Sequence, residues 1–176
     1  KYSRRLADLE RKVASDSTLS LSLEQFVDHV SRLTADLNTA WANDERVQSL
    51  KIAIQVTKIL GDTSGPRFYP YVFALVVDVL DKFGVMVYNR LMNKAEESLA
   101  EASGNTKLKH KLPVNFTCKD VPQPCKDTCR NWFFKSACIR ELVPRIYIEM
   151  TLLRSYRYIV PENEFGPIIA RLGNMI

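Results

Sequence analysis

The stretch that decides the fold is residues 71–91, YVFALVVDVLDKFGVMVYNRL. Apolar side chains occupy nearly every side of a helix drawn through it, and the polar residues Asp78, Lys82 and Asn89 form only a narrow stripe. A helix that is apolar almost all round is typical of one that packs on several sides. We therefore predict that a helix from Tyr71 to about Ala100 forms the centre of the core.

The segments before this helix predict two shorter helices. Ser22 followed by Gln25 matches a capping box, so we expect one helix to run from there to about Trp41. Asn43 is expected to cap the next helix, which Gly61 can end. Because the link between them is short, the two helices should be antiparallel neighbours. The core face of the second one is predicted to consist of Val47, Leu50, Ile54 and Ile59.

The segments after the central helix predict a loop and then a broken helical run. Residues 103–124 contain a glycine and three prolines, and we predict that they form a mobile surface loop. A helix is expected from Asp127 to near Leu142. It should stop there because Pro144 lacks an N–H donor and disfavours helical geometry at the residue before it. Pro144 is then predicted to lie in the first turn of another helix, which continues to about Val160.

The two ends of the chain also read as helical. Residues 1–14 predict a short charged helix. The closing segment has a helical apolar stripe, whose face we expect to pack against a further helix that the sequence does not contain. The chain is therefore expected to be a fragment of a longer protein. The stripe consists of Phe165, Ile168, Ile169, Leu172 and Met175.

Composition and periodicity together indicate one all-α domain spanning residues 1–176. The chain has 176 residues, 46% of them hydrophobic, which is enough for a core without other support. No segment shows sustained alternation of period two, so no strand is predicted. Helices in antiparallel pairs favour a HEAT-like α-solenoid of helical hairpins, and a plain helical bundle is the alternative. No apolar run approaches the roughly 20 residues that a bilayer-spanning helix requires.

The sequence contains no pattern that predicts catalysis, a cofactor or a metal. Phosphate-binding loops, zinc-protease motifs and nucleophile elbows are absent, so we expect a non-enzyme without cofactors. Four cysteines and a glycosylation sequon at Asn115 are compatible with a secreted, disulfide-bonded protein. The large apolar core favours reduced and mostly buried thiols instead. The spacing of the cysteines also lacks the paired knuckle of a zinc site. They are Cys118, Cys125, Cys129 and Cys138.

The net charge of +5 leaves a nucleic-acid-binding helical repeat as an alternative class of function. Acidic neighbours such as Asp127, Glu141 and Glu149 interrupt the basic residues, which favours an ordinary solvated helix face. A helical scaffold with an unrelated partner is a third possibility. The residues that could grip phosphates between aromatic rings are Arg130, Arg140, Arg154 and Arg157, with Tyr156 and Tyr158.

The helix junction at Pro144 is the strongest candidate for an interaction site. It places Arg145 and Tyr147 at an interrupted helix end, and both residue types anchor protein interfaces well. The alternative is that Pro144 merely turns the chain while Arg145 pairs internally with Glu141 or Glu149, each one helical turn away.

Long composite strings show what the chain is similar to. AWANDERVQSLKIAIQ (residues 40–55), FYPYVFALVVDVLDKFG (residues 68–84) and CRNWFFKSACIREL (residues 129–142) closely resemble the large α-solenoid subunits of retriever, a part of the Commander endosomal sorting assembly. These subunits are paralogous to the large subunit of retromer. The resemblance implies a non-catalytic scaffold of HEAT-like hairpins, cytoplasmic and peripheral on endosomes, that helps to recycle cargo and contacts membranes indirectly.

The resemblance also implies partners and a site. In the retromer paralogue a P-R-L-Y-L motif docks the arrestin-fold subunit, and here the matching residues read Pro144, Arg145, Ile146, Tyr147 and Ile148. Both leucines have become isoleucine, which keeps apolar volume but moves a branch point. The expected partner is therefore the arrestin-fold subunit of retriever. The phosphatase-fold subunit would be held by parts of the protein outside this chain, other Commander subunits would complete the assembly, and no nucleic acid is expected.

Overall fold

The computed structural model of the chain describes residues 23–61, 69–103 and 111–175. Within these residues the secondary structure is helical without any strand, which confirms the all-α, solenoid-like class. The charged helix predicted at residues 1–14 and the Ser22 cap lie outside the described residues. We predicted one domain; the contacts of the chain group into two compact units, Lys1–Val79 and Leu80–Ile176, and each is described by itself.

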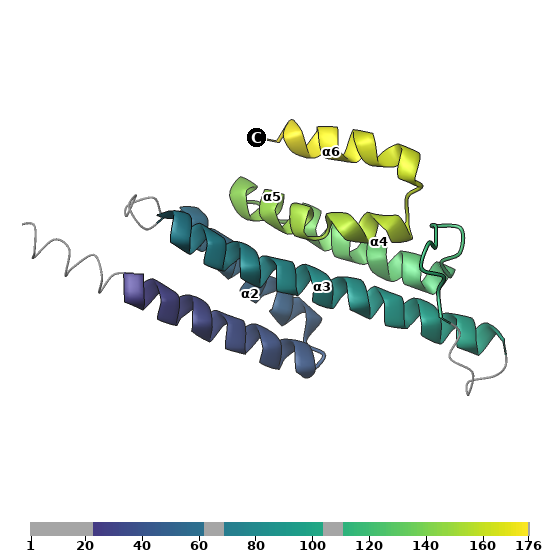
Figure 1. The fold of residues 1–176 in the computed structure, drawn as a ribbon, viewed down its shortest axis with the longest axis horizontal. Coiled ribbons are helices and arrows are strands. Elements are labelled where there is room, and N and C mark those ends of the chain that lie inside the picture. The colour runs from purple at the N-terminus through teal and green to yellow at the C-terminus, as the bar shows by residue number, and fades with distance from the viewer. Residues whose placement is uncertain (1–22, 62–68, 104–110, 176) are drawn as a thin grey trace, which may run out of the picture. The chain divides into compact units, whose positions relative to one another are not determined.

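The first unit begins with a helix at residues 23–42, and α2 (Arg46–Lys58) folds back along it as predicted (Figure 1). A short 3-10 turn, η1 (Ile59–Gly61), ends α2. The predicted cap at Asn43 is wrong, because α2 starts later, with Glu45 at the cap position and no side-chain cap. The chain turns instead through Asp44, which has a positive φ of 62°. Arg46 closes the corner by donating to the Trp41 carbonyl oxygen at 2.8 Å.

The core face of α2 is shifted from the predicted one. Leu50 and Ile59 are buried as expected, whereas Ile54 is half-buried and Val47 is 53% exposed. The helix actually buries a face centred on Ala53 and Val56, and Val47 lies on the side of the helix opposite Val56. The fully buried or nearly buried residues of α2 are Ser49, Leu50, Ile52, Ala53, Val56 and Thr57.

Helix α3 (Tyr69–Ala102) is the longest element, as predicted, and its bounds differ from the expected ones by two residues at each end. In the second unit its face of Phe83, Val87, Leu91 and Ala95 is fully buried at a spacing of four residues. Gly84 lies where α3 approaches α5 closely: a Cβ atom there would stand 2.7 Å from the Thr151 carbonyl oxygen. A side chain at position 84 would therefore push against backbone.

The second unit continues with α4 (Gln123–Ala137), α5 (Leu142–Thr151), the 3-10 segments η2 (Leu153–Tyr158) and η3 (Glu162–Glu164), and α6 (Phe165–Gly173). α4 and α5 contact each other, and α6 lies along α5 (Figure 1). The closing helix is thus present. Of its predicted stripe, Leu172 is buried and Ile169 is exposed.

The break before Pro144 begins five residues earlier than predicted. α4 already ends at Ala137, and α5 begins at Leu142 with Glu141 at its cap position, so the expected stop near Leu142 is wrong. Pro144 occupies the first turn of α5, as predicted, where its missing N–H would have no intrahelical acceptor anyway. The predicted continuation to Val160 is also wrong, because the α-helix ends at Thr151 and tightens into η2.

The described part of the predicted loop, residues 111–122, packs against the rest of the second unit. Its side chains Leu112, Phe116 and Val121 are buried. Arg157 donates from Nε to the Phe116 carbonyl oxygen at 2.9 Å and from Nη2 to the Val114 carbonyl oxygen at 3.1 Å. Its guanidinium also lies 4.1 Å from the centre of the Phe116 ring. This segment is therefore fastened by apolar burial and by one arginine.

Candidate docking site on helix α5

The five residues of the predicted motif divide into two groups. Pro144, Ile146 and Ile148 are buried in the second unit, whereas Arg145 and Tyr147 are half-buried and reach the surface. The first three thus hold α5 in place. Arg145 and Tyr147 are the members that can contact another molecule.

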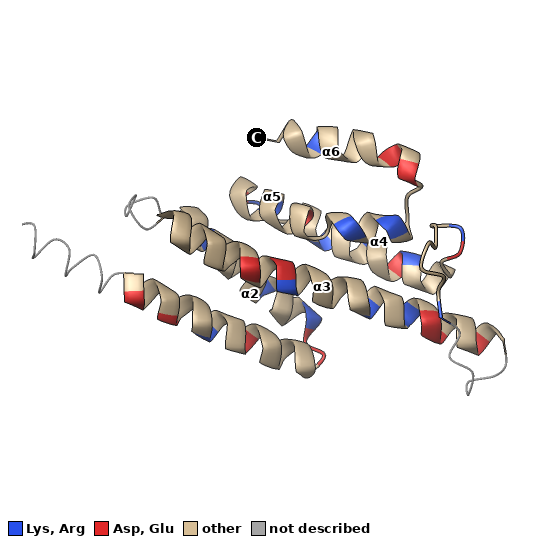
Figure 2. Cartoon of the chain, in the orientation of Figure 1, with Lys and Arg blue, Asp and Glu red and all other residues tan. Residues whose placement is uncertain are grey.

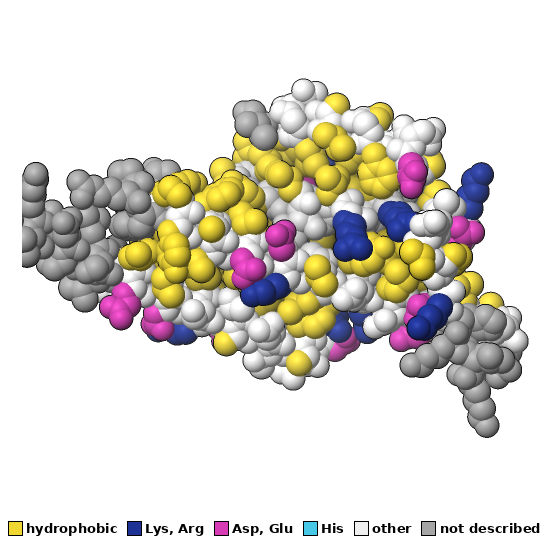
Figure 3. All heavy atoms as spheres, in the orientation of Figure 1, with side chains coloured by type: hydrophobic (Ala, Val, Ile, Leu, Met, Phe, Trp, Pro, Cys, Tyr) yellow, Lys and Arg dark blue, Asp and Glu magenta, His cyan; other side chains and the backbone are white. Residues whose placement is uncertain are grey.

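An exposed apolar edge runs along α5 on the side that carries Tyr147. Val143, Tyr147 and Met150 follow each other at spacings of four and three, which places them on one side of the helix, away from Arg145. Val143 is 43% exposed and Met150 is 51% exposed, whereas exposed Leu142 lies one helical turn before Arg145. Figure 3 shows apolar side chains gathered where α5 and α6 lie. Sequence reasoning did not single out Leu142, Val143 and Met150, although their helical spacing around the motif was a usable signal.

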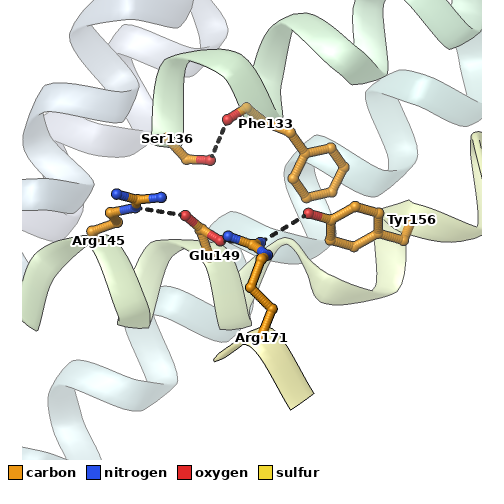
Figure 4. Close-up of polar contacts among 6 residues, drawn as sticks. All are labelled: Phe133, Ser136, Arg145, Glu149, Tyr156 and Arg171. Carbon is orange, nitrogen blue, oxygen red and sulfur yellow. Dashed lines mark hydrogen bonds and ion pairs between the residues drawn. The ribbon is translucent and has the colours of Figure 1, made fainter. Parts of the chain in front are cut away.

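Arg145 is held by a buried carboxylate on its own helix. Its Nε donates to Glu149 Oε1 at 2.9 Å, and the Glu149 side chain is only 2% exposed. Figure 4 shows a second arginine on the same carboxylate: Arg171 of α6 donates from Nη2 to Glu149 Oε2 at 2.5 Å. The internal pairing of Arg145 with Glu149, weighed above as the alternative, is thus present. It leaves 32% of the Arg145 side chain exposed.

The surroundings of Arg171 extend this cluster to α4 and η2. Arg171 Nη2 lies 3.4 Å from the Tyr156 hydroxyl oxygen, and the Tyr156 ring stacks on Phe133 at 3.8 Å between ring centres. The hydrogen bond to Glu149 raises the pKa of Arg171, and burial raises the pKa of Tyr156. Sequence reasoning missed Arg171, because 22 residues separate it from Glu149 and only the tertiary fold joins them.

The cluster of Arg145, Arg171 and Glu149 carries two positive charges and one negative charge. Both oxygens of Glu149 are occupied by arginines, so the buried carboxylate is fully paired, as a buried charge must be. Among the described residues, the terminal nitrogens of Arg145 have no hydrogen-bond acceptor. The arrangement can therefore offer guanidinium donors to a group from outside.

Several residues of the alternative nucleic-acid stripe are engaged inside the protein. Tyr158 is fully buried and its hydroxyl donates to the Tyr88 carbonyl oxygen, and the Tyr156 ring stacks on Phe133. Arg157 is engaged with the loop carbonyls, and Arg154 lies over the Tyr88 ring at 4.2 Å. Basic positions of the second unit also lie among acidic ones (Figure 2). Tyr158 and Arg157 are therefore used within the second unit rather than offered to phosphates.

The four cysteines are unpaired, and only two of them are buried, because Cys118 is half-buried and Cys138 is exposed. Cys125 and Cys129 are fully buried, and burial raises the pKa of their thiols to about 11 and about 12. Each thiol donates to a backbone carbonyl oxygen at 3.2 Å, of Leu91 and Ser155 respectively. In the described part of the chain no three His, Cys, Asp or Glu residues gather as metal ligands would. No helix described there is long and apolar enough to span a bilayer.

Fold and site together define the class as an all-α, solenoid-like protein whose helix α5 exposes apolar side chains. A family model described as VPS35L matches residues 1–176, and the chain belongs to this family. It is 42% identical over 154 residues to "VPS35 endosomal protein-sorting factor-like" of Danio rerio, 88% of this chain. The human protein of that name is 37% identical over 158 residues, 90% of this chain. That of Dictyostelium discoideum is 36% identical over 173 residues, 97% of this chain. The chain spans 15 to 16% of the length of these relatives.

Proposed function

We propose that the chain is the N-terminal part of a non-catalytic scaffold that acts in endosomal sorting as the large α-solenoid subunit of retriever, and that α5 docks the arrestin-fold subunit. Membership of the VPS35L family and the names of the relatives support the sorting role. The observation that carries the docking site is that α5 presents a half-buried Arg145, held by Glu149, together with exposed apolar side chains.

The physical properties of this edge suit a protein partner. Arginine and tyrosine supply large contact areas and strong hydrogen bonds at the centre of interfaces. Exposed Leu142, Val143 and Met150 add apolar surface that an incoming subunit can bury. Because Pro144, Ile146 and Ile148 anchor α5 in the core, the edge is presented on a packed helix rather than on a loop.

The other parts of the proposal follow from the family. The phosphatase-fold subunit would bind parts of the protein outside this chain, and other Commander subunits would join the assembly around it. The scaffold would lie peripherally on endosomes, in the cytoplasm, with membrane contact made through its partners. It would use no cofactor and carry out no chemistry of its own.

Two matched valines test the docking site. Val143 and Val47 are both exposed, and each is the second residue of its helix, where an added carboxylate suits the positive end of the helix dipole. Val143→Asp should weaken binding of the purified arrestin-fold subunit about tenfold or more, because it places a charge in an apolar contact. Val47→Asp should leave the affinity within about twofold of wild type.

The assay is isothermal titration calorimetry, with circular dichroism to establish that both variants keep the wild-type melting temperature. Absence of binding by the wild-type chain would refute the proposed partner. Equal affinities for the two variants would remove α5 from the interface. Binding of RNA with a steep salt dependence would support the nucleic-acid class instead.

A further inference from the structure

Resting on the proposed function, we infer that Glu149 is a positioning residue that aims Arg145 outward, and that the docked subunit presents a carboxylate to the terminal nitrogens of Arg145. The partner group is thus assigned by chemistry: an aspartate or glutamate side chain that approaches the end of the guanidinium.

The direction of approach follows from which donors are already used. A guanidinium is a planar fork that can bind a carboxylate along its side, through Nε and one terminal nitrogen, or at its end, through both terminal nitrogens. In Arg145 the Nε donates to Glu149 Oε1 at 2.9 Å (Figure 4). The side edge is therefore occupied, and the end edge is left for another molecule.

The sign of the partner group follows from the charge balance. A single pair of Arg145 and Glu149 would be neutral and would attract a carboxylate only weakly. Arg171 supplies a second guanidinium to the same carboxylate, and its pKa is raised by that hydrogen bond, so it stays charged. The cluster keeps one net positive charge next to the exposed part of Arg145, which favours an anionic group over a neutral one.

The burial of Glu149 makes this arrangement rigid before docking. Its side chain is 2% exposed and both of its oxygens are bonded from two different helices, α5 and α6. A long arginine side chain normally loses conformational freedom when it enters an interface. With its Nε already fixed, Arg145 has less freedom to lose, so the tie between the helices should favour docking.

The first experiment changes the charge without changing Arg145. Arg171→Gln removes one positive charge from the cluster, and Arg130→Gln is its control, because Arg130 forms an exposed ion pair with Asp127 on α4 of the same unit. Arg171→Gln should weaken binding of the arrestin-fold subunit about fivefold at low salt and should reduce the salt dependence of the affinity. Arg130→Gln should change the affinity less than twofold. Equal effects of the two variants would overturn the inference.

The second experiment keeps the charge of residue 145 and removes its fork. Arg145→Lys retains the positive charge, but its ammonium cannot pair with Glu149 and also present two parallel donors. The affinity of the Arg145→Lys variant for the subunit should be about tenfold or more below that of wild type, close to the affinity of Arg145→Ala. Full affinity of Arg145→Lys would overturn the end-on geometry.

A third measurement does not need the subunit. In nitrogen-15 NMR spectra, the Nε–H signal of Arg145 should be visible and slow to exchange in the wild-type chain and lost in Glu149→Gln, while exposed Arg140 serves as an internal reference. Titration with acetate should shift the Arg145 side-chain signals more than those of Arg140. Equal behaviour of the two arginines would overturn the positioning role. Failure of the wild-type chain to bind the subunit would instead refute the proposed function, while the NMR comparison would still test the positioning role of Glu149.

Discussion

Adding a single methyl group at Gly84 should destabilise the second unit, although alanine has a higher helix propensity than glycine. Alanine is about 1 kcal/mol more favourable than glycine in a helix interior. A Cβ at this position would stand 2.7 Å from the Thr151 carbonyl oxygen and 3.1 Å from its Cγ2 atom. Because the nearer obstacle is backbone at the end of α5, relief requires α5 to move. Overpacking of this kind costs about 1–3 kcal/mol, and we place the cost at the upper end. The expected net loss for Gly84→Ala is therefore about 1–2 kcal/mol.

Urea unfolding followed by tryptophan fluorescence and circular dichroism measures this loss. Trp132 reports on the same unit, since it lies edge-on to Phe83 at 5.9 Å between ring centres. Gly173→Ala is the matched control, because nothing stands within 4 Å of a Cβ there, and it should be neutral or stabilising by about 0.5 kcal/mol. Gly84→Ala with Thr151→Ser should remain destabilised, because serine removes only the methyl group. A Gly84→Ala chain as stable as wild type would refute the close approach of α3 and α5.

Three further predictions concern other residues. Arg145→Ala should weaken binding of the arrestin-fold subunit by about 2–5 kcal/mol in calorimetry, while the melting temperature stays within a few degrees of wild type. Unchanged affinity would remove Arg145 from the site. Arg157→Ala should cost about 2 kcal/mol of unfolding free energy and speed hydrogen exchange in the segment that it fastens, because two hydrogen bonds and a cation–π contact are lost; unaltered exchange would contradict this role. The raised pKa values of Cys125 and Cys129, about 11 and about 12, mean that the unfolded chain loses thiol protons at lower pH than the folded one. Stability should therefore fall as the pH rises above about 9 towards 11, which pH-dependent melting measures, and a flat profile over that range would argue against thiol burial.

Periodicity was sufficient to predict the elements whose packing follows from their own sequence. α3 is apolar on almost every side, so its identity as the core helix needed no tertiary information, and its ends were predicted within two residues. The hairpin before it followed in the same way from the short link. Val47 was misplaced because an apolar residue at a helix start is compatible with either face, and only the partners of α2 decide which face is buried.

The candidate site was less accessible to sequence reasoning, because it depends on tertiary contacts. Pro144 marks the start of α5 correctly, but the end of α4 depends on how the chain turns at residues 138–141. Within the motif, residue type already separates Arg145 and Tyr147, which reach the surface, from the apolar members, which are buried. The partner of Glu149 on α6 could not be predicted, because nothing in the spacing of the two residues brings them together.

The unequal burial of the thiols also allows a spectroscopic probe to be attached selectively to one cysteine. Cys138 is exposed immediately after α4, whereas Cys125 and Cys129 are sealed and protonated at neutral pH. A maleimide dye or spin label should therefore attach to Cys138 far faster than to the buried pair, and replacing the half-buried Cys118 would leave a single labelling position. That position lies four residues before Leu142, so a probe placed there would sense the arrival of a ligand on α5 without any engineered cysteine.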